Sequence, residues 1–421
     1  MKRYSEYKDS GVKWIGEIPS HWESRFLSQI ASEQNLSNKG MINDNLLSLS
    51  YGRIIRKSMD SANGLLPASF ETYQVINNGN IILRFTDLQN DHKSLRVGLV
   101  KEEGIITSAY TCITPKKSVL SEYLYFLLHS ADIKKVFYGM GGGLRQNLNY
   151  AEFRKLRLMI PPLPEQNEIV AYLDNKVSKI DKYISTAEKK IAALDELKQV
   201  IIADAVTHGI NPNASMKDSG IPWIGMVPEH WTRARYKDIF NIEDEKVGKR
   251  NDLTLLSLTK KGVIVRDLSE GKGKFPKDYE SYKVVNPNNI ILCLFDVDET
   301  PRTVGVSHNK GMITGAYDIF EIKNAKLEFI YYLYLSIDDK KGFKSLYKGL
   351  RKVIPLPSLL SAYINLPPIS EQNEIVAYID RKVAQIDKMK AAELAQIDKL
   401  KEYKQRLISD VVTGKVKVTN E

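Results

Sequence analysis

Residues 8–22 read KDSGVKWIGEIPSHW, and residues 217–231 read KDSGIPWIGMVPEHW. Ten of the fifteen positions are identical, and all four tryptophans of the protein lie in these two segments. A segment of this length that recurs so far along a chain indicates an internal duplication. We therefore expect two copies of one structural unit.

A second pair of matching segments supports the duplication. EQNEIVAY occurs at 165–172 and again at 371–378. Between the Trp segments and these stretches, the copies share apolar patches such as LLSLS at 46–50 and LLSLT at 255–259. Such shared patches are rich in Ile, Val, Leu, Tyr and Thr and predict strands, and the polar segments that differ between the copies predict loops. We expect a first block at 1–162, a long helix at 163–209, a second block at 210–368, and a second helix with a C-terminal tail at 369–421.

The two segments that follow the blocks have the pattern of long helices. Apolar residues recur at steps of three and four, and this heptad pattern predicts a coiled coil. In the first segment these residues are Val170, Leu173, Val177, Ile180, Ile184, Ala187, Ile191, Leu194, Leu197 and Ile201. In the second they are Val376, Ile379, Val383, Ile386, Ile397, Leu400 and Leu407.

Each helix needs a partner, because an apolar stripe of this length is unstable in water. The nearest partner is the other helix, and a two-fold relation between two copies makes the pair antiparallel. We therefore expect an α+β protein in which two homologous mixed α/β domains are joined by an antiparallel coiled coil, with pseudo-two-fold symmetry. Packing of each helix onto its own block and a homodimeric coiled coil remain alternatives.

Composition narrows the classes of function. The 421 residues include 61 Lys and Arg against 51 Asp and Glu, a formal net charge of +10, which favours nucleic acid or an acidic partner. The two cysteines, Cys112 and Cys293, are too few for a disulfide scaffold or a Cys-based zinc site. No apolar run approaches the roughly 20 residues of a membrane helix, and the start lacks a signal-peptide core. We expect a soluble cytoplasmic protein that does not associate with membranes.

Motifs for catalysis are not evident in the sequence. SEGKGKFP at 269–276 lacks the spacing of a phosphate-binding loop, and GMGGGLRQN at 139–147 lacks the third glycine of a dinucleotide fingerprint. His21 and His230 occupy equivalent places in the Trp segments, where packing or hydrogen bonding is the simpler interpretation. We expect no active site and no metal site in this chain.

Basic residues concentrate where the copies differ or where loops are expected. Arg, Gln and Asn can contact base edges in two places at once, whereas Lys suits phosphate. The candidates for DNA contact in the first block are Arg53, Arg56, Lys57, Arg84, Arg96, Arg145, Gln146 and Asn147. Those in the second block are Lys260, Lys261, Arg266, Lys272, Lys274, Arg302, Arg351 and Lys352. For any single one of them, a solvated surface charge is the alternative.

These features together resemble a known family. The repeated WIGxxPxHW segment, PPLPEQNEIVAYLD at 161–174, PPISEQNEIVAYID at 367–380 and the closing VTGK at 412–415 resemble the specificity subunit of type I restriction-modification systems along essentially the full length. The resemblance implies two target-recognition domains, each reading one half of a bipartite sequence in double-stranded DNA. It also implies that the coiled coil sets the gap between the half-sites.

The resemblance further implies that other subunits perform the chemistry. Two methyltransferase subunits would dock on the helices and use S-adenosylmethionine, and two restriction subunits would use ATP and magnesium. This chain would then be a non-catalytic recognition subunit with no cofactor of its own. Two alternatives remain open at this point. One is a self-contained enzyme that modifies or cleaves DNA, and the other is a coiled-coil scaffold without DNA specificity.

Overall fold

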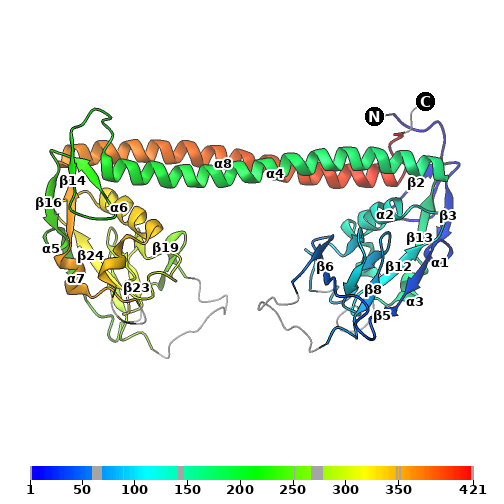
Figure 1. The fold of residues 1–421 in the computed structure, drawn as a ribbon, viewed down its shortest axis with the longest axis horizontal. Coiled ribbons are helices and arrows are strands. Elements are labelled where there is room, and N and C mark those ends of the chain that lie inside the picture. The colour runs from blue at the N-terminus through cyan, green and yellow to red at the C-terminus, as the bar shows by residue number, and fades with distance from the viewer. Residues whose placement is uncertain are drawn as a thin grey trace. The chain divides into compact units, whose positions relative to one another are not determined.

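A computed structural model describes residues 2–58, 69–88, 90–140, 147–250, 252–266, 278–347, 349 and 352–418. The chain divides into two compact units. Unit 1 comprises Met1–Ala187 and Leu394–Glu421, and unit 2 comprises Glu188–Glu393. Each unit therefore contains one globular domain and half of each of two long helices, α4 (Leu163–His208) and α8 (Ile369–Val412) (Figure 1).

The domain of unit 1 is built on small antiparallel sheets. Its largest sheet has the strand order β10-β9-β12-β4, a second has the order β11-β8-β5, and the pairs β1-β2, β6-β7 and β13-β3 complete the set. The strands are β1 (Tyr7–Asp9), β2 (Glu17–Pro19), β3 (Glu23–Phe26), β4 (Ala31–Gln34), β5 (Leu36–Ser37), β6 (Leu47–Ser50), β7 (Arg53–Arg56), β8 (Gln74–Ile76), β9 (Ile81–Leu83), β10 (Val97–Leu99), β11 (Gly104–Ile106), β12 (Thr111–Pro115) and β13 (Arg157–Ile160). The helices are α1 (Leu27–Ile30), α2 (Ser121–Ile133), η1 (Val136–Gly139) and α3 (Tyr150–Phe153).

The domain of unit 2 repeats most of this arrangement, although its second sheet has two strands where that of unit 1 has three. Its largest sheet has the order β17-β24-β21-β22, which matches the four-stranded sheet of unit 1 strand for strand. The strands are β14 (Met216–Asp218), β15 (Met226–Pro228), β16 (Thr232–Arg235), β17 (Phe240–Glu243), β18 (Leu256–Thr259), β19 (Gly262–Val265), β20 (Lys283–Val285), β21 (Ile290–Leu292), β22 (Val304–Val306), β23 (Gly311–Ile313), β24 (Asp318–Ile322) and β25 (Tyr363–Leu366). The helices are α5 (Tyr236–Ile239), α6 (Leu327–Lys340), η2 (Gly342–Leu346) and α7 (Leu356–Ser361).

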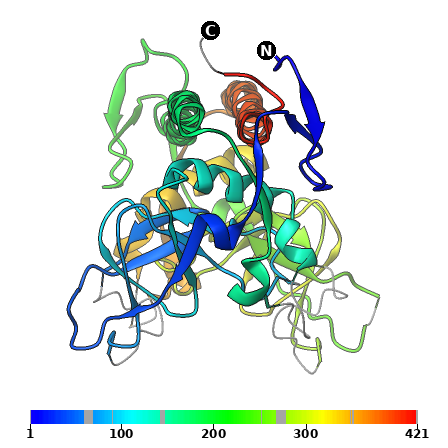
Figure 2. The same ribbon diagram turned by 90° about the vertical axis from the view of Figure 1, so that its right-hand side faces the viewer.

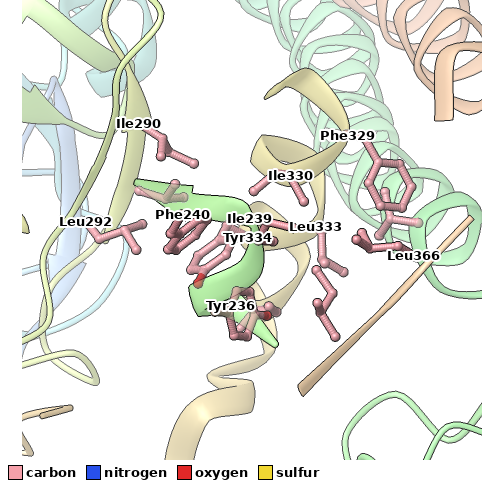
Figure 3. Packing of buried hydrophobic residues seen from close by; sticks show 14 of the residues in the cluster. Tyr236, Ile239, Phe240, Ile290, Leu292, Phe329, Ile330, Leu333, Tyr334 and Leu366 are labelled. Atoms are coloured by element: carbon pink, nitrogen blue, oxygen red, sulfur yellow. The ribbon is translucent and has the colours of Figure 1, made fainter. Parts of the chain in front are cut away.

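A single apolar cluster joins the sheet of unit 2 to its helices. The rings of Tyr236, Phe240 and Tyr334 contact one another, and α6 contributes Leu333 and, farther from these rings and on the side of Leu366, Phe329 (Figure 3). The same cluster includes residues at the end of α4 and at the start of α8. The long helices are therefore anchored in the core of the domain.

The two long helices pair with each other in each unit. α4 is Leu163–His208 and α8 is Ile369–Val412. In unit 1, Lys404 of α8 bonds Asp181 of α4. In unit 2, ion pairs join Lys190 to Glu393, Asp195 to Lys390 and Lys198 to Asp387. Along the unit 2 pairs, numbers rise in α4 as they fall in α8, so the helices are antiparallel.

This pairing confirms the predicted fold class, two α+β domains with paired antiparallel helices. One detail of the predicted heptad is wrong. Leu197 is 46% exposed, and Ile202 is buried where Ile201 was expected in the seam. A straight α-helix drifts from a strict seven-residue repeat, and Ile202 packs into the domain core of unit 2 near the end of α4.

Candidate nucleic-acid interface

The start of α4 is fastened to the first Trp segment by one carboxylate. Trp22 is fully buried, and its Nε1 donates to Glu165 Oε1 at 3.2 Å. His21 Nε2 lies 2.8 Å from Glu165 Oε2, and the Tyr4 hydroxyl donates to Oε1 at 2.5 Å. Burial and the bond to Glu165 hold the pKa of Tyr4 well above its usual range. The carboxylate therefore joins two distant parts of the sequence.

Unit 2 repeats this connection with equivalent residues. Trp231 Nε1 donates to Glu371 Oε1 at 3.2 Å, and His230 Nε2 lies 2.6 Å from Oε2. The interpretation of both histidines as hydrogen-bonding residues is confirmed. We call these arrangements the helix joints: Trp22, His21, Glu165 and Gln166 in unit 1, and Trp231, His230, Glu371 and Gln372 in unit 2.

The glutamine of each helix joint fixes the helix that lies beside it. Gln166 Oε1 accepts from the backbone N–H of Leu120, which precedes α2, and its Nε2 donates to Pro161 O. Gln372 makes the same bonds to Lys326 N and Pro367 O. A buried amide with its donor and acceptor both satisfied specifies one orientation. The hydrogen bonds of Glu165 and Gln166, and of Glu371 and Gln372, therefore explain why the dipeptide Glu-Gln recurs at the start of both long helices.

The other helix also ends at the same joint. In unit 1, the β1–β2 hairpin stands beside the C-terminal end of α8 (Figure 2), and the Tyr7 hydroxyl donates to Gly414 O at 3.1 Å. A Cβ on Gly414 would lie 2.3 Å from Pro19 Cδ, closer than atoms can approach. Each domain thus holds the start of one long helix and the end of the other.

A hairpin carries several of the candidate basic residues in each unit. In unit 1, β6 and β7 are joined by Tyr51 and Gly52, both with positive φ, as in the type I′ turns that favour tight hairpins. The hairpin packs on β10 because Gly98 has no side chain there, and a Cβ would lie 2.6 Å from Leu49 Cδ1. Gly305 plays the same part beneath the β18–β19 hairpin of unit 2.

The hairpin and the neighbouring loop form one surface in each unit. In unit 1, Gly52 abuts Leu95, so residues 51–57 adjoin the loop 84–96. Asn147 joins the same loop, because its side-chain oxygen accepts from Asp87 N at 3.0 Å. In unit 2, the hairpin 260–266 packs on β22, and Lys352 bonds Asp298 of the loop 293–303 at 2.9 Å. We call these the loop–hairpin surfaces.

The candidates differ in how far they are open to a ligand. Exposed side chains are those of Arg53, Arg56, Lys57, Asn147, Lys260 and Lys261. Half-buried side chains are those of Arg84, Arg266, Arg302 and Lys352. Arg145, Gln146, Lys272, Lys274 and Arg351 lie outside the described residues.

Several of these cations are paired with carboxylates. Arg56 Nε donates to Glu102 at 2.8 Å, and Arg84 lies 3.5 Å from Asp91. Arg302 contacts Asp338 and Asp339 at 3.2 and 3.1 Å.

Arg96 corrects the interpretation drawn from the sequence. Its side chain is 0% exposed, and its guanidinium donates to Tyr138 Oη and to the carbonyls of Arg84, Thr86, Asp87 and Asp91. Its backbone N–H donates to Asp132 at 2.6 Å, and burial raises the pKa of that carboxyl to about 6. A buried guanidinium with its donors so engaged holds the loop 84–96 together and is closed to DNA.

One exposed aromatic residue was missed by reasoning from charge. Tyr51 is 78% exposed at the tip of its hairpin, and its φ of 45° is uncommon for a residue other than glycine. An exposed aromatic held in a strained turn beside Arg53 is suited to contact a nucleotide. The sequence signal was the glycine Gly52 in a two-residue connection between two short segments that contain apolar residues, LSLS at 47–50 and RIIR at 53–56.

Two features are absent from the described ranges. Within them, no three His, Cys, Asp or Glu side chains converge as a site for a metal ion. None of the helices found there has the length and apolar character needed to cross a lipid bilayer.

Comparisons with known proteins agree with this geometry. Residues 19–194 match the family model for the type I restriction modification DNA specificity domain. The type I restriction enzyme MjaVIII specificity subunit of Methanocaldococcus jannaschii is 25% identical over 82% of this chain and 81% of its own length. A second relative from that organism is also 25% identical and matches 98% of both chains.

Solved structures share the fold. A chain from a structure described as the structural basis of complex assembly and conformational transition of the type I R-M system matches with a TM-score of 0.65. It is 16% identical, and the match covers 94% of this chain and 98% of that one. The HsdS subunit from Thermoanaerobacter tengcongensis matches with a TM-score of 0.50 at 16% identity, over 95% of this chain and 98% of its own. The chain is therefore similar to specificity subunits of type I restriction-modification systems, and its residues 19–194 match the family model for their DNA specificity domain.

Proposed function

We propose that the chain is the DNA-specificity subunit of a type I restriction-modification complex, and that each unit reads one half of a bipartite DNA target. The observation that carries this proposal is the pair of loop–hairpin surfaces. They sit on matching frames, yet Tyr51-Gly52-Arg53 in unit 1 corresponds to Lys260-Lys261-Gly262 in unit 2. Base reading depends on side-chain identity, so equal frames with unequal side chains suit two different half-sites.

The paired helices support a fixed spacing between the half-sites. α4 has 46 residues, which at about 1.5 Å per residue is roughly 70 Å of continuous helix. Both of its ends are fastened to a domain, as are those of α8. We infer that the length of these helices sets the number of base pairs left unread, because half-sites must be met in register along the duplex.

The chemistry of the complex belongs to partner subunits. Two methyltransferase subunits and two restriction subunits assemble with the chain, and the chain itself recognises DNA without catalysing a reaction. We further propose that S-adenosylmethionine is used by the methyltransferase subunits, and ATP and magnesium by the restriction subunits. We also propose that this DNA-binding complex is located in the cytoplasm.

Mapping of methylated adenines tests the reading of half-sites. Cells would express the chain with its methyltransferase partner as wild type, as Arg53→Ala/Lys57→Ala, or as Lys260→Ala/Lys261→Ala. We expect each pair of substitutions to relax or weaken methylation at one half of the target and to leave the other half unchanged. The two pairs are matched controls, because each removes two exposed cations from equivalent hairpins.

The possible outcomes separate the candidate functions. Equal loss at both halves would contradict the assignment of one half-site to each unit. Methylation or cleavage by the purified chain alone would establish a self-contained enzyme instead. If the assembled complex bound cognate and random duplex equally, the chain would be a coiled-coil scaffold without DNA specificity.

A further inference from the structure

In unit 1, one carboxylate connects the β6–β7 hairpin to both long helices. Arg53 at the start of β7 donates from Nη2 to Asp181 Oδ2 of α4 at 3.3 Å. Lys404 of α8 donates to the other oxygen, Oδ1, at 2.5 Å. Asp181 is the residue on which these three elements meet.

Among the described residues of unit 2, the helix–helix part of this connection is present without a bond to the hairpin. Asp387 and Lys198 are the repeat equivalents of Asp181 and Lys404, and Lys198 Nζ lies 3.0 Å from both oxygens of Asp387. The hairpin position that corresponds to Arg53 is Gly262, which has no side chain to offer. The ion pair between the helices therefore belongs to both copies, whereas the bond to an arginine of the hairpin belongs to unit 1.

The bond to Asp181 leaves Arg53 available to a ligand. Its side chain is 69% exposed, whereas that of Asp181 is 33% exposed. A guanidinium has five N–H donors in a rigid fork, and the bond to Asp181 uses one terminal nitrogen. The backbone beneath Arg53 is also fixed, because Leu49 and Ile54 pack on Gly98. Arg53 is therefore held at both its base and its tip.

We propose that Asp181 is a positioning residue for DNA recognition: it orients the Arg53 fork toward the half-site read by unit 1. This inference rests on the proposed function, since it assumes that the β6–β7 hairpin meets DNA. Holding a flexible side chain in its bound orientation lowers the ordering entropy that binding must overcome. Asp387 has no such role in unit 2, because Gly262 gives it nothing to orient.

Affinity alone does not reveal this role. Replacing any carboxylate near DNA removes repulsion of phosphates and strengthens binding to every sequence. Asp181→Asn and Asp387→Asn share this effect, and both lose an equivalent ion pair to a lysine. The quantity to measure is discrimination, which is the affinity for cognate duplex divided by the affinity for a duplex with one half-site scrambled.

The experiment uses the chain assembled with its methyltransferase partner in competition binding. The half-site of unit 1 is the one whose discrimination falls in Arg53→Ala. We expect Asp181→Asn to lower discrimination at that half-site by about 1.4-fold to fivefold, the range for an exposed ion pair. Asp387→Asn should leave discrimination at both half-sites unchanged. In an Arg53→Ala background, Asp181→Asn should have no further effect on discrimination.

Three results would overturn the inference. The first is that Asp181→Asn and Asp387→Asn have equal discrimination. The second is that Asp181→Asn lowers discrimination further in the Arg53→Ala background. The third is that Asp181→Asn lowers discrimination at the half-site of unit 2. If Asp181→Asn destabilises the fold, Arg53→Lys tests the same orientation, because lysine keeps the charge but lacks the fork. It should lower discrimination while the salt dependence of binding stays the same. A wild-type complex without discrimination would instead refute the proposed function.

Discussion

Arg96 shows how far charge alone misleads at the scale of a residue. The sequence places it in a polar segment that differs between the copies, beside cations that are exposed. In the structure, its guanidinium donates hydrogen bonds to four backbone carbonyls and to the hydroxyl of Tyr138. The difference could not be predicted, because the carbonyls that surround Arg96 come from the course of the loop and carry no signature in the sequence.

The stability of unit 1 should therefore depend on Arg96. Arg96→Ala leaves buried carbonyls without donors, and we expect it to lower the free energy of unfolding by about 3–5 kcal/mol. Arg53→Ala is the matched control, because an exposed substitution changes stability by about 0.5 kcal/mol or less. Chemical denaturation of both variants measures the difference. A loss of DNA discrimination in Arg96→Ala with full stability would contradict the structural role.

His129 gives unit 1 a dependence on pH. Burial, followed by the charge of Lys404, lowers the pKa of His129 from 6.5 to about 4. Between these two pKa values, His129 is protonated in the unfolded chain but not in the folded chain. The free energy of unfolding therefore falls as the pH falls from about 6.5 to 4. The loss reaches at most about 3.5 kcal/mol, because the two pKa values differ by about 2.5 and each pKa unit corresponds to about 1.4 kcal/mol.

A single substitution isolates this effect. Leu335 is the repeat equivalent of His129, so His129→Leu places in unit 1 the residue that unit 2 carries at this position. We expect the variant to lose less stability than the wild type between pH 6.5 and 4, measured by denaturation at several pH values. Parallel curves for the two proteins would exclude His129 as the source.

At the scale of elements, the sequence predicts most of what the structure contains. The heptads predict the helices, and the repeated EQNEIVAY marks where each begins. The helix joints could not be predicted, because His21 and Trp22 lie more than 140 residues from Glu165 and the bonds between them follow from the tertiary fold. The departure from the predicted heptad at Leu197 and Ile202 also follows from the tertiary fold. Near the end of α4, Ile202 packs into the core of the domain, which the heptad pattern does not predict.

The joint of unit 1 is more tightly packed than that of unit 2. Gly414 and Gly209 both have positive φ, so alanine carries a similar backbone cost of about 1–2 kcal/mol at each. A Cβ on Gly414 would overlap Pro19 at 2.3 Å, whereas on Gly209 its nearest neighbour is Glu371 Oε1 at 3.3 Å. We expect Gly414→Ala to destabilise the chain by about 1–3 kcal/mol more than Gly209→Ala, the range for overpacking. Thermal unfolding of the two variants compares them directly, and equal melting temperatures would contradict it.

At the scale of the whole molecule, duplication explains why one chain can read two half-sites. The frame is repeated, and the segments that differ between the copies include loops and hairpin tips such as Tyr51-Gly52 and Lys260-Lys261. The sequence shows this division, because identical segments mark the frame and divergent segments mark the surfaces. It does not assign bases to side chains, since a base contact depends on the position of each side chain on the duplex.

The helix length should be separable from the reading of bases. Inserting one heptad beside Lys190 in α4 and one beside Glu393 in α8 lengthens both helices at residues that are in contact, and it preserves the register of the seam. Seven residues add about 10 Å of helix, which corresponds to about three base pairs at about 3.4 Å each. We therefore expect methylation mapping to find the same two half-sites with a longer spacer.

A single heptad in α4 alone is the control, because it misaligns the ion pairs of the two helices and should abolish methylation. An unchanged spacer in the doubly lengthened protein would mean that the helices do not set the distance, since every base-reading side chain would be the same.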